Sequence, residues 1–209
     1  EGIGGADAGG TRGDVAEELE VLSAQGTHHR TPDVVCFVNG LPLVVIEAKR
    51  PEGGHTREPM VAEGISQQLR NQRADEVPHL FAVAQLLLAV SQTEARYGTT
   101  GTPKKFWAKW REQEWGDAHL AAVKNQPLPA NVQAALFAGK PQHLADYFAA
   151  LWSRPMQLTE QDRLMAGLLT PQRLLEFLRS FVLFDRKVGK LVARYQQFFG
   201  IRALMARLV

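Results

Sequence analysis

Three charged residues lie at the borders of two apolar runs early in the chain. In the segment TPDVVCFVNGLPLVVIEAKR, Asp33 precedes the first run, and Glu47 and Lys49 follow the second. Charge beside buried strands is costly, so these residues are candidates for chemistry. Two neighbouring carboxylates repel each other, and both stay ionised only with a cation between them. Their oxygens suit a hard ion such as Mg²⁺, and a nearby lysine can orient water or offset charge on a phosphate.

The turn between the two runs would bring these residues together. Its Asn-Gly pair is a strong hairpin signal and predicts that the runs pair as antiparallel strands. Asp33 would then lie across from positions 47–48, at about 5 Å, and Glu47 and Lys49 would share one face. Such an arrangement predicts a site for phosphodiester hydrolysis. The alternative is an Asp that begins a strand and a Glu–Lys pair at a solvated strand end.

The elements that would position this site form an α/β front part. Apolar alternation and helical spacing predict strands near 34–38, 43–49 and 80–90 and a helix near 60–73. The stretch ARYGTTGTPKKFWAKWREQE predicts a second hairpin, or a strand and a loop. In this stretch Trp107 and Trp110 are expected to anchor packing.

The last third of the sequence is predicted to be helical. QHLADYFAALW is amphipathic, and LTPQRLLEFLRSFVLF begins with Thr170 as a helix N-cap and Pro171 at the first helical position. KLVARYQQFFGIRALMARLV is predicted to form another amphipathic helix. The predicted organisation is a flexible start at 1–15, a core at 16–126 and a helical region at 127–209.

Composition is that of an ordinary globular protein, with 45% hydrophobic and 22% charged residues. The apolar runs are too short to span a bilayer, and no export signal is recognisable. The single cysteine, Cys36, excludes an internal disulfide framework and favours the cytoplasm. Residues 154–209 carry 10 Lys and Arg against 4 Asp and Glu. This part could meet nucleic acid, or it could be the solvated surface of helices.

The segment PDVVCFVNGLPLVVIEAKRP resembles the nuclease segment of the restriction (motor) subunit of type I restriction–modification enzymes. The resemblance continues through AEGISQQLRNQ, VPHLF and QLLLAVS, and resumes at LLTPQRLLEFLRSFVLFD and KLVARYQQFFGI. It covers most of the chain from about residue 16 to residue 205. It implies a mixed-sheet PD-(D/E)xK restriction-endonuclease-like core followed by a mostly helical region.

Position by position, the resemblance implies roles for individual residues. Asp33 and Glu47 match the metal-binding acids, and Lys49 matches the catalytic lysine. A glutamine in the following helix supports the site in this family; Gln68 matches best, with Gln67 as the alternative. The family pattern has a tyrosine four residues later, whereas this sequence has Gln72.

The resemblance also implies cofactors and partners. RYQQFF is similar to the glutamine motif that reads ATP adenine in such motors, with Gln197 in the matching place. The sequence contains no GxxxxGK[ST] phosphate cradle, so ATP binding is expected only in the full-length protein. The implied activity is Mg²⁺-dependent cleavage of double-stranded DNA without sequence readout of its own, coupled to ATP-driven translocation. The implied partners are DNA and the methyltransferase and specificity subunits, with no membrane.

Two other functions stay open. The same fold could serve a stand-alone repair or resolvase-like nuclease, although VPHLF and RYQQFF argue against this. The chain could instead be a non-catalytic module that docks the motor to a methyltransferase core, a role compatible with catalysis. Arg50, Arg70 and Arg73 are candidate phosphate contacts, with solvated surface as the alternative for each.

Overall fold

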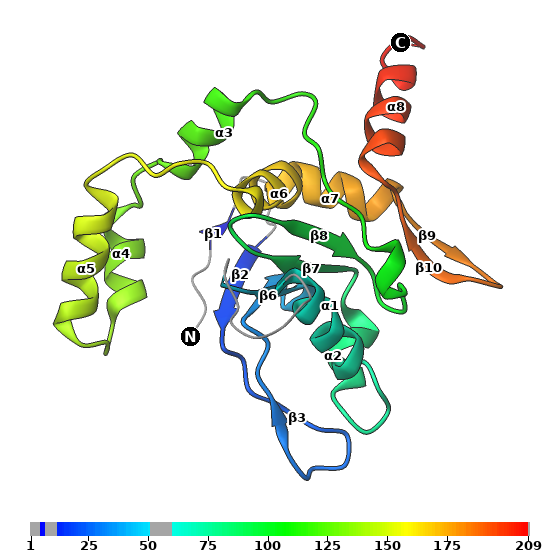
Figure 1. Cartoon of the computed structure of the whole chain (residues 1–209), viewed down its shortest axis with the longest axis horizontal. Coiled ribbons are helices and arrows are strands. Elements are labelled where there is room, and N and C mark those ends of the chain that lie inside the picture. Colours follow the sequence, from blue (N-terminus) through cyan, green and yellow to red (C-terminus); the bar gives the residue numbers. More distant parts are fainter. Residues whose placement is uncertain (1–4, 7–11, 51–59, 209) are drawn as a thin grey trace.

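A six-stranded mixed sheet forms the centre of the computed structural model, which describes residues 5–6, 12–50 and 60–208 (Figure 1). Its spatial order is β1-β2-β5-β6-β7-β8. Strands β6 and β7 run parallel, and the other neighbouring pairs are antiparallel. The strand bounds are β1 (Gly5–Ala6), β2 (Arg12–Glu17), β5 (Val34–Val38), β6 (Leu41–Ala48), β7 (Leu86–Val90) and β8 (Ala95–Gly98).

Helices cover both faces of this sheet. The helices of the described residues are α1 (Met60–Asn71), α2 (Pro78–Val83), α3 (Asp117–Lys124), α4 (Ala130–Phe137), α5 (Gln142–Trp152), α6 (Glu160–Leu169), α7 (Pro171–Ser180) and α8 (Tyr195–Met205), with a 3₁₀ helix at Lys104–Phe106. Two separate hairpins pair β3 (Val21–Leu22) with β4 (His29–Arg30) and β9 (Val182–Asp185) with β10 (Gly189–Val192). None of the helices in the described ranges has the length and apolar character needed to cross a membrane.

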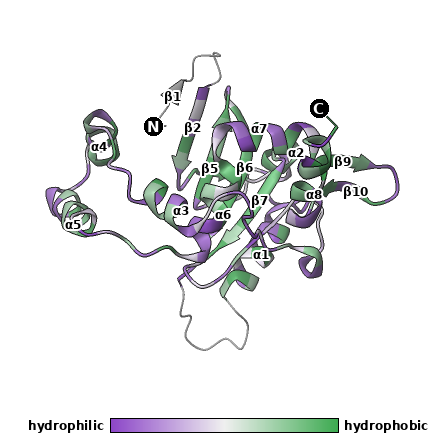
Figure 2. Ribbon diagram, turned by 90° about the horizontal axis from the view of Figure 1, so that it is seen from above, coloured by the Kyte–Doolittle hydropathy of each residue, from purple (hydrophilic) through white to green (hydrophobic). Residues whose placement is uncertain are grey.

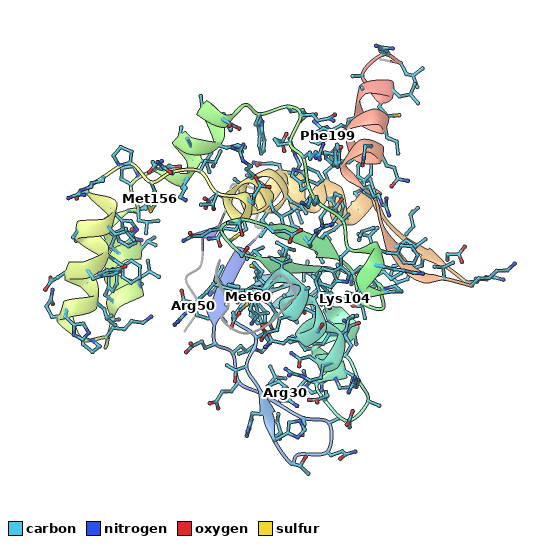
Figure 3. All side chains as sticks on the ribbon, viewed as in Figure 1. Arg30, Arg50, Met60, Lys104, Met156 and Phe199 are labelled. Atoms are coloured by element: carbon cyan, nitrogen blue, oxygen red, sulfur yellow. The ribbon has the colours of Figure 1, made fainter. Side chains whose placement is uncertain are left out.

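The sheet separates two apolar cores, because successive side chains of a strand point to opposite faces. On one face, Val44 and Ile46 of β6 pack with apolar side chains of α6, α7 and α8. Phe199, labelled in Figure 3, lies where α8 joins this core. On the other face, Val45 packs with α1 and α2. Strands β6 and β7 contribute to both cores, and Figure 2 shows their hydrophobic character.

The strand predicted at residues 80–90 is shorter than expected. α2 begins at Pro78, and β7 begins only at Leu86, so the prediction is wrong for residues 80–85. Pro78 is the first helical residue, where its fixed φ favours the helix and its missing N–H is not needed. All residues of β7 are buried. This explains the continuous apolar run LLLAV in a strand that is covered on both faces.

Helices dominate the last third of the chain, as predicted, but a hairpin interrupts them. Thr170 precedes α7 and Pro171 is its first residue, which confirms the predicted helix start. The predicted continuation of this helix through residues 181–184 is wrong, and so is the helical prediction for residues 190–192. The run FVLF is rich in strand-favouring residues. Gly189, with a φ of +89°, lies at the turn between β9 and β10, where a positive φ suits glycine.

The predicted segment boundaries do not coincide with structural ones. The boundary after residue 15 falls inside β2, which pairs with β5. The boundary after residue 126 divides elements that share a core, because Leu164 and Phe177 pack behind β6. By contrast, α4 and α5 pack on each other and project from the sheet (Figure 1). The predicted fold class, an α/β mixed-sheet core followed by a mostly helical region, is confirmed.

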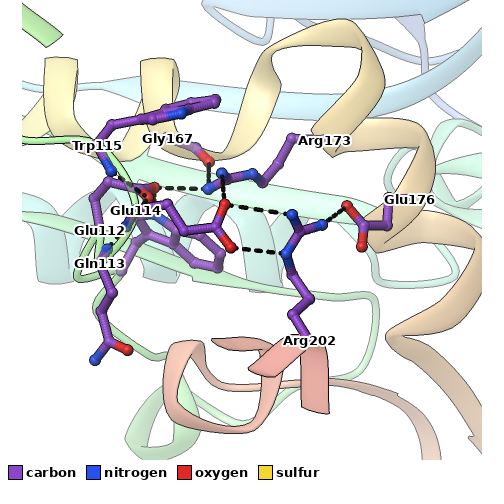
Figure 4. A network of polar contacts seen from close by, with 9 residues as sticks. Glu112, Gln113, Glu114, Trp115, Gly167, Arg173, Glu176 and Arg202 are labelled. Carbon is purple, nitrogen blue, oxygen red and sulfur yellow. Dashed lines mark hydrogen bonds and ion pairs between the residues drawn. The ribbon is translucent and has the colours of Figure 1, made fainter. Parts of the chain in front are cut away.

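An ion-pair network joins α7 and α8 to the segment that follows the 3₁₀ helix (Figure 4). The Arg173 guanidinium, whose side chain is 5% exposed, donates to Glu112 at 2.8 Å and to Glu114 at 2.7 Å. It also lies 4.0 Å from the ring centre of Trp115. Glu114 accepts in turn from Arg202 of α8 at 2.8 Å. The network therefore fixes the position of α8 relative to α7.

Replacing Arg173 with methionine is expected to lower the free energy of unfolding by about 3–5 kcal/mol, because the buried Glu112 carboxylate loses its cation. Chemical denaturation followed by circular dichroism measures this change. The matched control Arg179→Met removes an exposed arginine of the same helix and should cost less than about 0.5 kcal/mol. Equal destabilisation of the two variants would contradict this role of Arg173.

Candidate active site

The predicted hairpin is confirmed and brings the three charged residues to one end of the sheet. β5 and β6 pair antiparallel, with Val34 opposite Ile46. One further step in this register places Asp33 opposite Glu47. Asn39 and Gly40 have φ values of +50° and +79°. Positive φ at both central residues is the geometry that favours Asn-Gly in a two-residue hairpin turn.

Asp33 and Glu47 both lie close to the Lys49 ammonium. Lys49 Nζ is 3.4 Å from Glu47 Oε2 and 3.9 Å from Asp33 Oδ2. The backbone N–H of Ala48 donates to the same Asp33 oxygen at 2.7 Å and so fixes this carboxylate. The backbone N–H of Lys49 donates to Val90 O at 2.7 Å, which extends the β6–β7 pairing by one residue. Lys49 therefore shares the face of Glu47, as predicted.

Helix α1 covers this charged end of the sheet, and a glycine permits the close approach. A Cβ atom added at Gly64 would lie 3.5 Å from both Glu47 Cβ and Lys49 Cγ, and 3.3 Å from Ala89 Cβ. A larger side chain at this position would push α1 away from the site. Met60, the first residue of α1, and Arg50, two residues beyond the end of β6, are both labelled in Figure 3.

The Glu47 carboxyl is buried, with 4% of the residue exposed. Burial, together with the nearby Asp33 carboxylate, raises the pKa of Glu47 from 4.5 to about 7, although the Lys49 ammonium acts against the rise. The single ammonium thus does not fully offset the cost of two carboxylates beside a buried strand end. A site in this state favours uptake of a proton or of a second cation.

These residues fit a divalent ion of the Mg²⁺ type. Asp33 and Glu47 supply oxygen donors, and Mg²⁺ is commonly bound by one or two carboxylates, with water and substrate phosphates as further ligands. The described residues include no group of three or more His, Cys, Asp and Glu side chains that could form a complete metal cage. The donor set therefore matches an ion that is shared with a substrate.

Gln68 of α1 binds the sheet, and Gln72, which follows α1, binds an adjoining turn. Gln68 is fully buried, and its Nε2 donates to Val45 O at 3.1 Å and to Leu88 O at 3.2 Å. Among the described residues, Gln68 Oε1 and Gln67 Oε1 are buried without a hydrogen-bond partner. Gln72, at the tyrosine position of the family pattern, accepts from the Gly101 N–H at 2.7 Å. Gln68 therefore holds α1 on β6 and β7, and its catalytic role stays a prediction.

Other predicted residues lie apart from the carboxylates. Gln197 Oε1 accepts from the Arg194 N–H at 2.8 Å and caps α8, which packs on the opposite face of the sheet. Arg70 binds Asn71 at the far end of α1, and Arg73 follows that end. The structure thus unites Asp33, Glu47 and Lys49 and does not bring these other side chains to them.

Two features of the site were not predicted from the sequence. The Ala48 N–H cannot be recognised in a sequence, because every residue except proline has such a donor. Gly64 could have been noticed as a glycine inside a helical pattern, which costs helix stability unless close packing requires it.

Residues 12–106 match the family model described as "Type I restriction enzyme R protein N terminus". This segment belongs to that family. The matched segment, residues 12–106, contains Asp33, Glu47, Lys49 and the whole of α1.

Two relatives extend the similarity over nearly the whole chain. The chain is 30% identical over 197 residues to the type I restriction enzyme HindI endonuclease subunit of Haemophilus influenzae, covering 92% of this chain and 15% of the relative. It is 25% identical over 197 residues to the putative type I restriction enzyme MjaIXP endonuclease subunit of Methanocaldococcus jannaschii. This match covers 93% of this chain and 16% of the relative. The chain thus spans about one sixth of the length of these relatives.

The raised pKa of Glu47 predicts an unusual pH dependence of stability. Between pH 4.5 and about 7 the folded state holds a proton that the unfolded state has released. Stability therefore falls as the pH rises through this window. Without divalent ions, Glu47→Gln is expected to be more stable than wild type by about 1–3 kcal/mol at pH 8 and nearly equal at pH 4.5.

Thermal unfolding of both proteins at the two pH values measures this difference. The control Glu20→Gln removes an exposed carboxylate and should follow wild type within about 0.5 kcal/mol at each pH. If Glu47→Gln were less stable than wild type at pH 8, the burial of an unfavourable charge would be disproved.

Proposed function

We propose that this chain is the endonuclease part of a type I restriction enzyme R subunit and hydrolyses phosphodiester bonds of double-stranded DNA with Mg²⁺. The observation that carries the proposal is the convergence of two carboxylates, Asp33 and Glu47, on the Lys49 ammonium at the end of β6. Membership of residues 12–106 in the type I R-protein N-terminal family supports it.

Asp33 and Glu47 would hold the ion through their carboxylate oxygens. Bound Mg²⁺ polarises a phosphoryl oxygen and acidifies water. Lys49 donates a hydrogen bond to a phosphate oxygen on which negative charge increases in the transition state. The Ala48 N–H keeps Asp33 oriented, and α1 limits the access of water to Glu47. Restricted water access strengthens each electrostatic contact within the site.

The larger assembly is part of the same proposal. The chain covers only a small part of its relatives, so ATP-driven translocation would reside outside it, with Gln197 contributing at most to the adenine site of the full-length protein. The target sequence would be read by a specificity subunit, in a cytoplasmic complex with a methyltransferase. The free Cys36, half-buried in β5, is compatible with that compartment.

Lys49→Ala is expected to reduce DNA cleavage by the assembled enzyme by at least about 10²–10³-fold, because a preorganised electrostatic group is removed. DNA binding and ATP hydrolysis should stay near those of wild type, whereas thermal stability should fall because the buried Glu47 carboxylate loses its cation. A supercoiled plasmid assay measures cleavage, with Lys187→Ala as the control at an exposed position. Cleavage within a few-fold of wild type would remove Lys49 from the mechanism. It would favour the alternative that the chain is a non-catalytic module that docks the motor to a methyltransferase core.

Asp33→Asn is expected to weaken Mn²⁺ binding by at least about ten-fold, since one of two anionic ligands is removed. Isothermal titration calorimetry measures this affinity without any cleavage. The control Asp75→Asn changes an exposed acid beyond the far end of α1 and should bind Mn²⁺ as wild type does. Equal affinities for wild type and Asp33→Asn would show that the Asp33–Glu47 pair is structural.

A further inference from the structure

A row of paired residues, charged at both ends, crosses the sheet at the level of the candidate active site. Asp33 lies opposite Glu47, which pairs with Ala89 of β7, and Ala89 pairs with Arg96 of β8. Beyond β8, Tyr97 forms a bridge with Ala108, and one step in this antiparallel register places Lys109 beside Arg96. Residues directly opposite each other on neighbouring strands project from the same face of a sheet.

The row therefore carries two carboxylates at one end and two cations at the other. Glu47 and Arg96 are two strands apart, which is about 10 Å at the usual strand spacing. This distance corresponds to roughly three nucleotides along one strand of duplex DNA. A nucleic-acid strand that places a phosphate at Lys49 would thus carry neighbouring phosphates close to Arg96.

The cationic end of the row opens into a polar cleft of about 420 Å³. Five cationic side chains line it: Arg96, Lys105, Lys109, Arg111 and Arg194. The 3₁₀ helix that begins at Lys104, labelled in Figure 3, contributes to its wall.

Acidic side chains offset only part of this charge. Glu94 binds Arg96 at 2.8 Å and Lys109 at 3.5 Å. Within the described part of the chain, Lys105, Arg111 and Arg194 form no ion pair, and all three are exposed. One acid against five cations, with three cations unpaired, is the composition of a site for a polyanion.

We propose that this cleft binds the phosphate backbone of DNA next to the phosphodiester that is cleaved, an inference that rests on the proposed nuclease function. Ala89 is buried beneath α1 between the two ends of the row, but Arg96 lies only two strands from Glu47 on the same face of the sheet. This proximity favours a substrate strand over an unrelated anion. Contacts of this kind position the duplex and carry no sequence information. Arg70 and Arg73, at the far end of α1, are less well placed for this task than the cleft.

Fluorescence anisotropy with a labelled duplex of random sequence tests the proposal, in EDTA so that neither metal binding nor cleavage contributes. The triple variant Lys105→Gln/Arg111→Gln/Arg194→Gln should bind at least about ten-fold more weakly than wild type at about 0.1 M salt. The slope of log affinity against log salt should fall by about 2–3, since each phosphate that is no longer neutralised lowers it by about 0.9. The double variant at 105 and 111 leaves the start of α8 intact and should show about two thirds of this change in slope.

The matched control neutralises three exposed cations outside the cleft, Arg179, Arg186 and Lys187. It should keep the wild-type affinity and slope. Wild-type binding by the cleft variants, equal weakening in the control, or no DNA binding by wild type would each overturn the cleft proposal. The Lys49→Ala cleavage assay and the Mn²⁺ titration of Asp33→Asn do not depend on these outcomes, so failure of the nuclease function is detected separately.

Discussion

The burial of a carboxylate at the end of β6 is the constraint around which this part of the molecule is arranged. Glu47 is held below α1, where water is scarce, and its pKa rises to about 7 as a result. Gly64 permits that burial, and Lys49 partly compensates for it. A side chain chosen for stability alone would be neutral here. Under the proposed function, the metal-dependent chemistry requires the charge at this position.

The same strand provides the hydrophobic support for this charge. Val44 and Ile46 anchor β6 to the helices behind the sheet, while Val45 and Glu47 face α1. Alternation along one strand thus joins the core and the site. The buried Gln68 amide adds a second attachment, because it binds carbonyls of both β6 and β7. Displacing α1 would therefore disturb the parallel pair and the carboxylate together.

Local patterns allowed the hairpin and its charged end to be predicted. The Asn-Gly turn, the alternation and the spacing of Asp33, Glu47 and Lys49 all lie within one short segment, residues 31–50. The start of α2 was missed because the apolar run that follows Pro78 is compatible with both helix and strand. The pairing of Ala89 with Arg96, and of Arg173 with Glu112, depends on packing between separate elements. Such contacts leave no periodic signal in a single sequence.

The parallel pairing of β6 with β7 has a consequence for synthesis of the protein. Parallel neighbours require a crossover, which here runs through α1 and α2, so the strand pair that supports the β5–β6 hairpin has high contact order. The rear core needs Phe198 as well, which lies more than a hundred residues beyond the end of β7. At about 5–20 residues per second, its synthesis follows that of β7 by roughly 5–20 s. The charged end of the β5–β6 hairpin is therefore synthesised well before the rear core that supports β6 can close.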